Sequence, residues 1–202
     1  CGVDYFDFYL FHALNRNSYK KHKECNSFEI VKQLKSEGKV KHIAMSFHDT
    51  ADILDMILSE QPQIGAVQLQ INYLAYDDPG VQSKECYDVA VKHGKKIIVM
   101  EPVKGGTLAN VPETVEKAFK DRNPDMSVPS WAIRYVAGLD NVMMVLSGMS
   151  NMQQIEDNMS YMKDFEVLNE DEKILVANAA EMISKDIKIP CTGCSYCTDG
   201  CP

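Results

Sequence analysis

The sequence predicts an α/β fold, the back part of a (β/α)8 barrel that contains about five strand–helix units. Short apolar runs alternate with amphipathic helical segments along the 202 residues, which predicts a parallel sheet. Most of these runs are apolar throughout, as in parallel strands that are covered on both faces. No G-x-G-x-x-G follows any of them, which disfavours an open dinucleotide-binding sheet. A complete barrel needs about 250 residues, so we expect only part of one here.

Five segments are expected to form the strands, because each is rich in branched and aromatic residues and lies between turn residues. They are Asp7–Phe11, Val40–Phe47, Ala66–Tyr73, Lys96–Val103 and Val142–Ser147. The third departs from the apolar pattern, because Gln68, Gln70 and Asn72 share one face at a period of two residues. Polar side chains are therefore expected inside the barrel at this strand.

Helix boundaries follow from capping residues. Helix starts are indicated by Asn26 with Glu29, by Asp49 or Thr50, by Ser150 with Gln153, and by Asn169. Helix ends are indicated by three glycines suited to the left-handed conformation, Gly38, Gly94 and Gly138. The resulting division is a partial barrel over residues 1–165, a C-terminal helix and linker over 166–190, and a cysteine-rich segment over 191–202.

The ends of the chain are expected to be cut. There is no initial Met, and the sequence opens almost directly into an apolar run. It stops at Pro202, one residue after the last cysteine. A front truncation agrees with five units taken from the back of an eight-unit barrel.

Charge and composition narrow the class of partner. The net charge is −8, which argues against nucleic acid or an anionic membrane as a partner. No apolar run approaches the roughly 18 residues of a membrane-spanning helix, and no signal peptide is visible. Seven cysteines fit thiols or metal ligands in a reducing compartment, so we expect a cytoplasmic protein.

The cysteine-rich segment has the spacing C-x-x-C-x-x-C-x-x-x-C-P, formed by Cys191, Cys194, Cys197 and Cys201. This spacing is typical of bacterial [4Fe–4S] ferredoxins, in which the fourth cysteine of such a run serves a second cluster. The sequence therefore predicts an iron–sulfur site in which Cys201 is the least certain ligand of the first cluster. A zinc site and a disulfide remain alternatives.

Candidate site residues are found where strands end, because active sites of such barrels lie at the C-terminal ends of the strands. Most of the residues at these positions are polar or glycine. They are His12, Ser46 with His48, Gln68 with Gln70 and Asn72, Met100 and Glu101 with Lys104 and Gly105–Gly106, and Ser147–Asn151.

Five stretches around these positions resemble the aldo/keto reductase family, in family order and over nearly residues 4–160. They are DFYLFH, GKVKHIAMSF, VQLQINYL, HGKKIIVMEPVKGGTL and VLSGMSNMQQIEDN. The P-C-x-x-C tail resembles a subgroup of that family that carries ferredoxin-like segments after the barrel. The resemblance implies an oxidoreductase that uses NADP or NAD on a small-molecule carbonyl substrate. The cluster would exchange electrons with a redox protein partner.

The resemblance also implies roles for individual residues. His12 would hydrogen-bond the substrate carbonyl as the catalytic histidine. Ser46 and Gln68, with Gln70 as a rival, would hold the nicotinamide carboxamide, and Met100 stands where many members stack a tyrosine. The adenosine phosphate end would meet residues around the last helix start, where free N–H groups favour anions. These are Gly148, Ser150, Asn151, Gln154 and Asn158.

Departures from the family pattern leave a second reading open. Phe47, Met100, Gly148 and Gln154 replace an asparagine, a tyrosine, a lysine and an arginine that the family commonly has there. The family's catalytic tyrosine, lysine and aspartate precede Asp4, so this chain alone is not expected to reduce carbonyls. The alternative is a non-catalytic barrel that binds cofactor or senses redox state.

Overall fold

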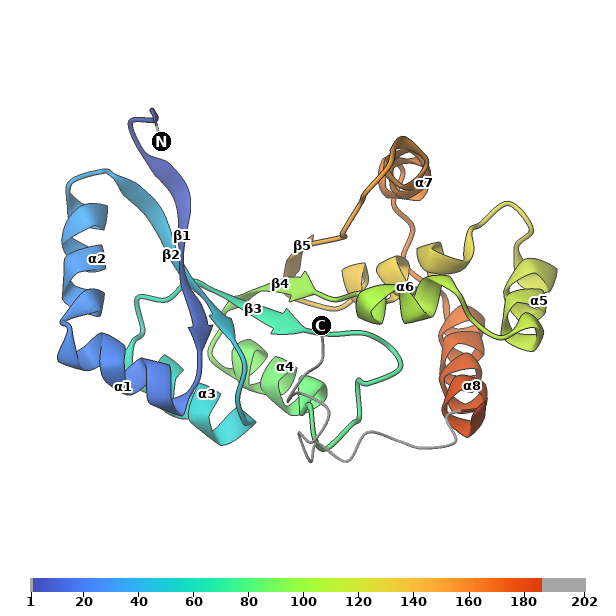
Figure 1. The fold of residues 1–202 in the computed structure, drawn as a ribbon, viewed down its shortest axis with the longest axis horizontal. Coiled ribbons are helices and arrows are strands. Elements are labelled where there is room, and N and C mark those ends of the chain that lie inside the picture. The colour runs from blue at the N-terminus through green and yellow to red at the C-terminus, as the bar shows by residue number, and fades with distance from the viewer. Residues whose placement is uncertain (1, 187–202) are drawn as a thin grey trace, which may run out of the picture.

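The computed structural model describes residues 2–186, and they form a parallel sheet flanked by helices (Figure 1). The strands pair in the order β1-β2-β3-β4-β5, and every pair is parallel. Their bounds are β1 Phe6–Leu14, β2 Val40–Phe47, β3 Ala66–Gln70, β4 Lys96–Met100 and β5 Val142–Val145. The helices are α1 Arg16–Glu24, α2 Ser27–Ser36, α3 Ala51–Glu60, α4 Ser83–Lys92, η1 Lys104–Ala109, α5 Glu113–Arg122, α6 Val128–Ala137, α7 Met152–Met162 and α8 Glu170–Asp186.

The arrangement is the predicted partial barrel. Consecutive strands are neighbours, and a helix or a longer connection crosses between each pair, as in β/α units. Within residues 2–186 the outer strands β1 and β5 each pair on one side only. The sheet is therefore an arc of five strands.

The main core lies between the sheet and the helices α1 to α4. Ile43, Met45, Val67, Ile97 and Val99 point to this side, and all five are nearly inaccessible to solvent. Successive residues of a strand point to opposite faces, so the residues between them face the other side. On that face Ala44, Ala66 and Ile98 form a small apolar cluster.

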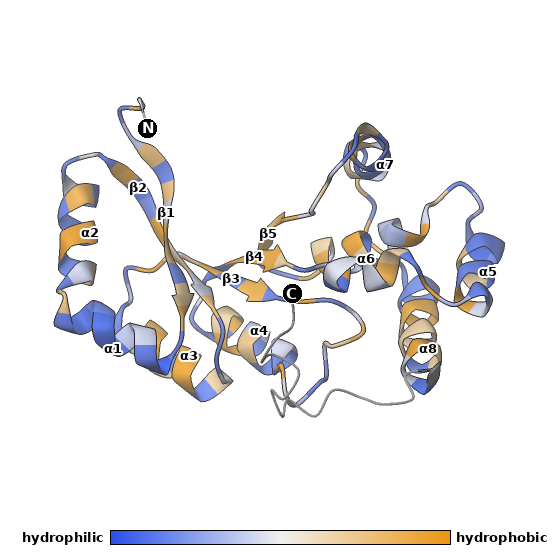
Figure 2. Ribbon diagram, viewed as in Figure 1, coloured by the Kyte–Doolittle hydropathy of each residue, from blue (hydrophilic) through white to orange (hydrophobic). Residues whose placement is uncertain are grey.

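A second core joins α5, α6 and α8 at the far end of the molecule (Figure 1). Trp131 stacks on Phe119 with ring centroids 4.9 Å apart, and both are fully buried. Figure 2 shows that the outward sides of α5 are hydrophilic while β3 and β4 are hydrophobic. This core fixes α8 against the barrel segment.

Strand ends differ from the prediction for local reasons. β3 stops at Gln70, because the side chain of Asn72 accepts the N–H of Ala75 at 2.9 Å and starts a turn. β4 stops at Met100, because Glu101 adopts a positive φ of 55°. β5 likewise ends at Val145, two residues before the predicted end. β1 instead continues past Phe11 to Leu14.

Several predicted helix caps were wrong. Asn26 makes no side-chain cap, because an unpredicted helix, α1, ends immediately before it. Asn15 and Ser18 form the capping box of α1. The helix α5 was also missed. The predicted helix cap by the Asn169 side chain was confirmed. Gly38 and Gly94 are left-handed at helix ends, as predicted.

Two further cap predictions need correction near the C-terminal half. α7 is capped by Asn151, whose side chain accepts the N–H of Gln154, and not by Ser150. Gly138 has φ −83°, so it is not left-handed. A Cβ there would lie 2.6 Å from Cγ1 of Val167, so any other residue would have to displace the side chain of Val167.

The outer strands β1 and β5 expose apolar side chains, since each is paired on one side only within the described residues. Phe6 is 46% exposed and Tyr9 is 39% exposed on β1, and Met143 and Met144 are exposed on β5. None of the described helices has the length and apolar character needed to span a membrane.

Candidate functional site

The predicted site residues of four adjacent strands come together at one end of the sheet. Ser46 of β2 is in register with Gln68 of β3, and Gln70 of β3 is in register with Met100 of β4. All four lie on the face opposite the helix-covered core, and His12 of β1 lies beside them. Parallel strands place their C-terminal ends at one edge, so this gathering follows from the topology.

A β-bulge positions His12. Phe11 pairs with Met45 and Leu14 pairs with Phe47, so β1 has one residue more than β2 between these pairs. The extra residue makes Ala13 left-handed, with φ 49°. Such a conformation costs an alanine about 1–2 kcal/mol, and bulges of this kind often re-aim a side chain next to a functional site.

The hydroxyl of Ser46 stabilises the bulge. It accepts the N–H of Ala13 at 2.7 Å and lies 3.5 Å from Nδ1 of His12. Ser46 is 2% exposed, whereas His12 is exposed. The Ser46 hydroxyl can both accept the backbone N–H and contact Nδ1, so Nδ1 faces the protein and Nε2 is the free ring nitrogen of His12. The exposed side of His12 can then donate a hydrogen bond.

Gln68 and Met100 form the next contact along the sheet. Nε2 of Gln68 donates to Sδ of Met100 at 3.2 Å. Both side chains are half-buried, and so is Gln70. Asn72 is fully buried and bonds Ala75 and the carbonyl of Glu101, so its role in the described chain is structural.

A cavity of about 500 Å³ lies where the last two strands end. It includes three of the residues predicted for the adenosine end of a cofactor, namely Gly148, Gln154 and Asn158, whereas Ser150 and Asn151 lie outside its lining. Its other walls come from the segments after β4 and β5 and from η1, α6 and α7, through Glu101, Pro102, Val103, Gly105, Gly106, Ala109, Pro129, Ile133, Leu146, Ser147 and Asp157.

Gly105 and Gly106 form part of the cavity wall that η1 contributes. Gly105 and Gly106 have φ of 61° and 97°, which L side chains rarely adopt. Because neither carries a side chain, the backbone itself borders the cavity. The backbone conformation therefore explains why glycine occurs at both of these predicted positions.

Asp157 was missed by the sequence analysis. It lines the cavity, and its Oδ2 accepts the hydroxyl proton of Ser127 at 2.7 Å. Asn158, the next residue of α7, donates through Nδ2 to the hydroxyl of Ser147 at 3.1 Å and accepts from the hydroxyl of Tyr161. The position of Asp157 in IEDN gave a signal, since residues 154, 157 and 158 share one face of a helix.

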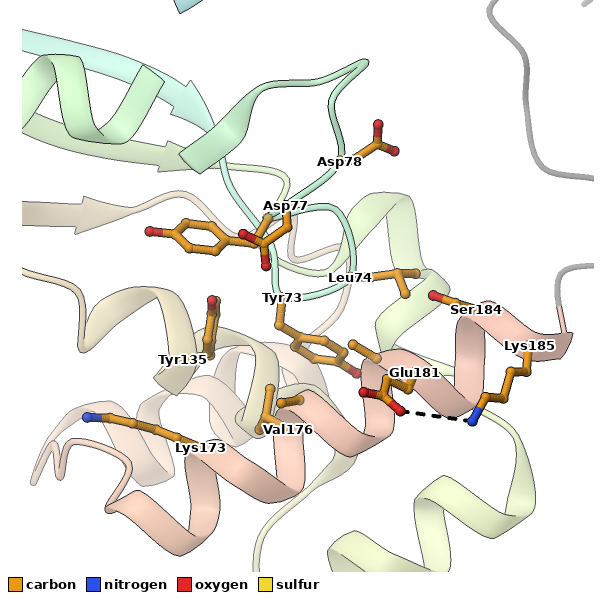
Figure 3. Close-up of a pocket in the computed structure, with 13 residues that line it drawn as sticks. Tyr73, Leu74, Asp77, Asp78, Tyr135, Lys173, Val176, Glu181, Ser184 and Lys185 are labelled. Carbon is orange, nitrogen blue, oxygen red and sulfur yellow. Dashed lines mark ion pairs between the residues drawn. The ribbon is translucent and has the colours of Figure 1, made fainter. Parts of the chain in front are cut away.

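A larger groove of about 730 Å³ lies elsewhere, between α8, α6 and the loop after β3 (Figure 3). Tyr73, Tyr76 and Tyr135 line it, and Glu181 and Lys185 of α8 form an ion pair at 3.9 Å along its rim. None of the predicted site residues borders this groove. The predicted site residues therefore favour the smaller cavity and the adjoining strand ends, and not the larger groove, as the functional site.

The predicted metal ligands Cys191, Cys194, Cys197 and Cys201 lie outside the described residues. Within residues 2–186 no three His, Cys, Asp or Glu side chains are grouped so that they could hold a metal ion.

Comparisons with known proteins identify the family and the fold. The family model described as the aldo/keto reductase family matches residues 1–177. No curated protein matches the sequence.

Solved structures show the same fold. The chain is similar to an aldo-keto reductase from Bacillus halodurans in its holo form, with a TM-score of 0.68, 20% identity and coverage of 88% of this chain and 59% of that one. It is also similar to an aldo-keto reductase from Klebsiella pneumoniae in complex with NADPH, with a TM-score of 0.64, 14% identity and coverage of 87% of this chain and 59% of that one. A third similar structure is the glycerol dehydrogenase from Gluconobacter oxydans, with a TM-score of 0.67, 18% identity and coverage of 94% of this chain and 62% of that one. The chain thus spans about three fifths of the length of these proteins.

Proposed function

Because the chain belongs to the aldo/keto reductase family, we propose that it is the C-terminal part of an oxidoreductase that binds NAD or NADP. The whole protein would transfer a hydride between this cofactor and a small carbonyl substrate. It would exchange electrons through an iron–sulfur segment with a redox protein partner in the cytoplasm. The observation that carries this proposal is the meeting of His12, Ser46, Gln68 and Met100 at four adjacent strand ends.

The residues present fit a nicotinamide. Its carboxamide offers N–H donors and a carbonyl acceptor. Ser46 and Gln68, which are in register on neighbouring strands, would be its hydrogen-bond partners. Gln68 now donates to the sulfur of Met100, which is a weak acceptor. It can therefore exchange this bond for a cofactor carbonyl at little cost. Gln70, two residues further along β3 and in register with Met100, is the alternative to Gln68 for this role.

His12 would act on the substrate. Nδ1 faces the hydroxyl of Ser46, so Nε2 is the ring nitrogen that would donate to a carbonyl oxygen at the mouth of the barrel. A donor fixed by the bulge stabilises the negative charge that develops on this oxygen. The nicotinamide, when bound, supplies or accepts the hydride.

The experiment is a binding titration of the 202-residue chain with NADH and NADPH, followed by nucleotide fluorescence. Gln68→Leu removes the carboxamide partner and should weaken binding roughly tenfold, the cost of losing a buried hydrogen bond. Gln33→Leu is the matched control, since Gln33 is exposed on α2, and it should leave binding unchanged. Absence of saturable binding by either nucleotide, or equal effects of both substitutions, would refute the proposed site.

The iron–sulfur part of the proposal rests on Cys191, Cys194, Cys197 and Cys201 and on their spacing alone. Iron and acid-labile sulfide should be measured per chain after anaerobic purification, together with the EPR spectrum of the reduced sample. About four of each with a reduced-cluster signal would support one [4Fe–4S] cluster. Zinc in place of iron, or no metal after reconstitution, would refute it.

A second candidate function is a non-catalytic barrel that binds cofactor or senses redox state. It is favoured by Met100 and Phe47, which occupy positions of a tyrosine and an asparagine in the resemblance, and by Gln154 in place of an arginine. The same titration, combined with a turnover assay of the whole protein, separates the two functions. Binding of nucleotide without turnover of any carbonyl substrate would favour the second function.

A further inference from the structure

The larger groove beside α8 has an aromatic floor that the proposed function does not use. The rings of Tyr73 and Tyr135 meet edge to face with centroids 6.2 Å apart, and Tyr76 meets Tyr135 in the same way at 6.0 Å. Small and apolar side chains of α8 form the opposite wall, namely Val176, Ala177 and Ala180. The groove can therefore bury apolar side chains between the tyrosines and α8.

The rim of the groove is acidic on the side of the loop after β3. Asp77 and Asp78 lie there, and both are exposed (Figure 3). Within residues 2–186 neither carboxylate forms an ion pair, whereas both lysines of the lining, Lys173 and Lys185, pair with carboxylates of α8. Two carboxylates beside aromatic rings attract a cationic side chain, because both the charges and the ring faces favour a cation.

The chain leaves α8 at this same groove. Ser184 and Lys185, near the end of α8, line the groove, and the helix ends at Asp186 (Figure 3). The sequence continues with one lysine between apolar residues, in the order Ile187, Lys188, Ile189 and Pro190, directly before Cys191. Residues 187–190 thus combine the two properties that the groove is suited to bind, a cation and apolar side chains.

The covalent connection makes such binding favourable. Four residues can extend over roughly 13 Å, and a compact space of about 730 Å³ measures about 9 Å across. Because the segment is attached at the groove, its effective concentration there is on the order of millimolar, so weak contacts suffice to hold it. In an extended segment the side chains of Ile187 and Ile189 would share one face and Lys188 would take the other.

We propose that residues 187–190 dock in the groove between α8, α6 and the loop after β3. The two isoleucines would pack against the tyrosines, and Lys188 would meet Asp77 and Asp78 at the rim. The cysteine-rich segment, which begins at Cys191, would then start at this side of the barrel segment. The inference does not depend on the proposed function, because it requires neither a nucleotide nor a metal.

The test is limited proteolysis of the 202-residue chain by trypsin, which can cleave after Lys188. Release of the fragment 189–202 would be followed by mass, with a synthetic peptide of residues 184–196 as the undocked reference. Cleavage in the chain should be at least about tenfold slower than in the peptide, because it requires the open form. The measurement would be made on iron-loaded chain and on chain treated with a chelator, and the protection should appear in both.

Two changes should remove the protection and leave every trypsin site in place. Asp77→Asn combined with Asp78→Asn should speed cleavage at least about threefold, because Lys188 loses its ionic partners. Asp125→Asn combined with Asp164→Asn is the matched control, since both aspartates are exposed and neither lines the groove.

The apolar contact has its own variant. Ile189→Ser should speed cleavage about fivefold or more, because less apolar surface is buried in the docked form. Ile174→Ser, at a position of α8 that is 59% exposed and outside the groove, should leave the rate unchanged.

Three results would overturn the docking. One is cleavage of the chelator-treated chain as fast as cleavage of the peptide. Another is protection that appears only in the iron-loaded chain, which would assign it to the cluster. The third is protection that neither the Asp77 and Asp78 changes nor Ile189→Ser reduces, which would place the segment at another surface. None of these results bears on nucleotide binding, so the proposed function would stand.

Discussion

Cys86 and Cys25 illustrate how burial separates two side chains of one type. Cys86 is 4% exposed in α4, and its Sγ lies 3.8 Å from the carbonyl oxygen of Asp49. Burial raises the pKa of the Cys86 thiol to about 12, with the carboxylate of Glu85 adding to the effect. Cys25, at the end of α1, is exposed. The thiolate is the reactive form, so the two should differ strongly in reactivity.

We expect an alkylating reagent at pH 8 to modify Cys25 at least about a hundredfold faster than Cys86, because the buried thiol is almost entirely protonated. Rates would be read from peptide masses after quenching at successive times. In denaturant the two rates should become similar. Similar rates in the folded chain would show that α4 opens readily, against the packing described here.

At the scale of elements, α8 is fastened to α6 by a buried ion pair. Nη2 of Arg134 lies 3.5 Å from the carboxylate of Glu172, and the two side chains are 4% and 8% exposed. Nε of Arg134 also donates to the carbonyl of Glu166, and Glu172 accepts the N–H of Asn169 as part of a helix cap. The pair therefore ties the helix start, the preceding loop and the second core together.

Glu172→Gln should lower the free energy of unfolding by about 3 kcal/mol, because it leaves the buried charge of Arg134 without its partner. Glutamine can still serve the helix cap, so the loss isolates the charge. Glu170→Gln, on the same helix and 84% exposed, should change stability by less than about 0.5 kcal/mol. Urea denaturation of both variants measures the difference. Equal small effects would show that the carboxylate of Glu172 is dispensable.

At the scale of the whole molecule, buried tyrosines set the response to alkaline pH. Burial is the main cause that raises the pKa of each of these side chains, to about 12 for Tyr19 and Tyr135 and upward for Tyr73, Tyr76 and Tyr161. In the unfolded chain the same groups ionise near pH 10. The folded chain therefore holds more protons than the unfolded chain above that pH.

The free energy of unfolding should consequently fall as the pH rises above about 10, because stability decreases with pH wherever the folded state binds more protons. The urea midpoint at successive pH values measures this fall. Tyr73→Phe should reduce the slope and leave stability at pH 7 unchanged or raised, because the Tyr73 hydroxyl is buried without a hydrogen-bond partner among the described residues. A slope that stays the same in this variant would contradict the assignment to Tyr73.

Local patterns in the sequence determined the alternation of strands and helices, the five strand positions and the partial barrel. They also placed His12, Ser46, Gln68 and Met100 at strand ends, since apolar periodicity and glycine ends are properties of neighbouring residues. The family resemblance was confirmed over residues 1–177. The roles of these residues and of the cysteine-rich segment stay predictions.

Only the tertiary structure decided how these positions work together. The bulge at Ala13 depends on the hydroxyl of Ser46, which lies 33 residues away in the chain. The charge of the cavity depends on Asp157, which Ser127 holds across 30 residues. Contacts of this kind join segments whose spacing is set by strand register and helix packing, and these arise only when the whole sheet is assembled.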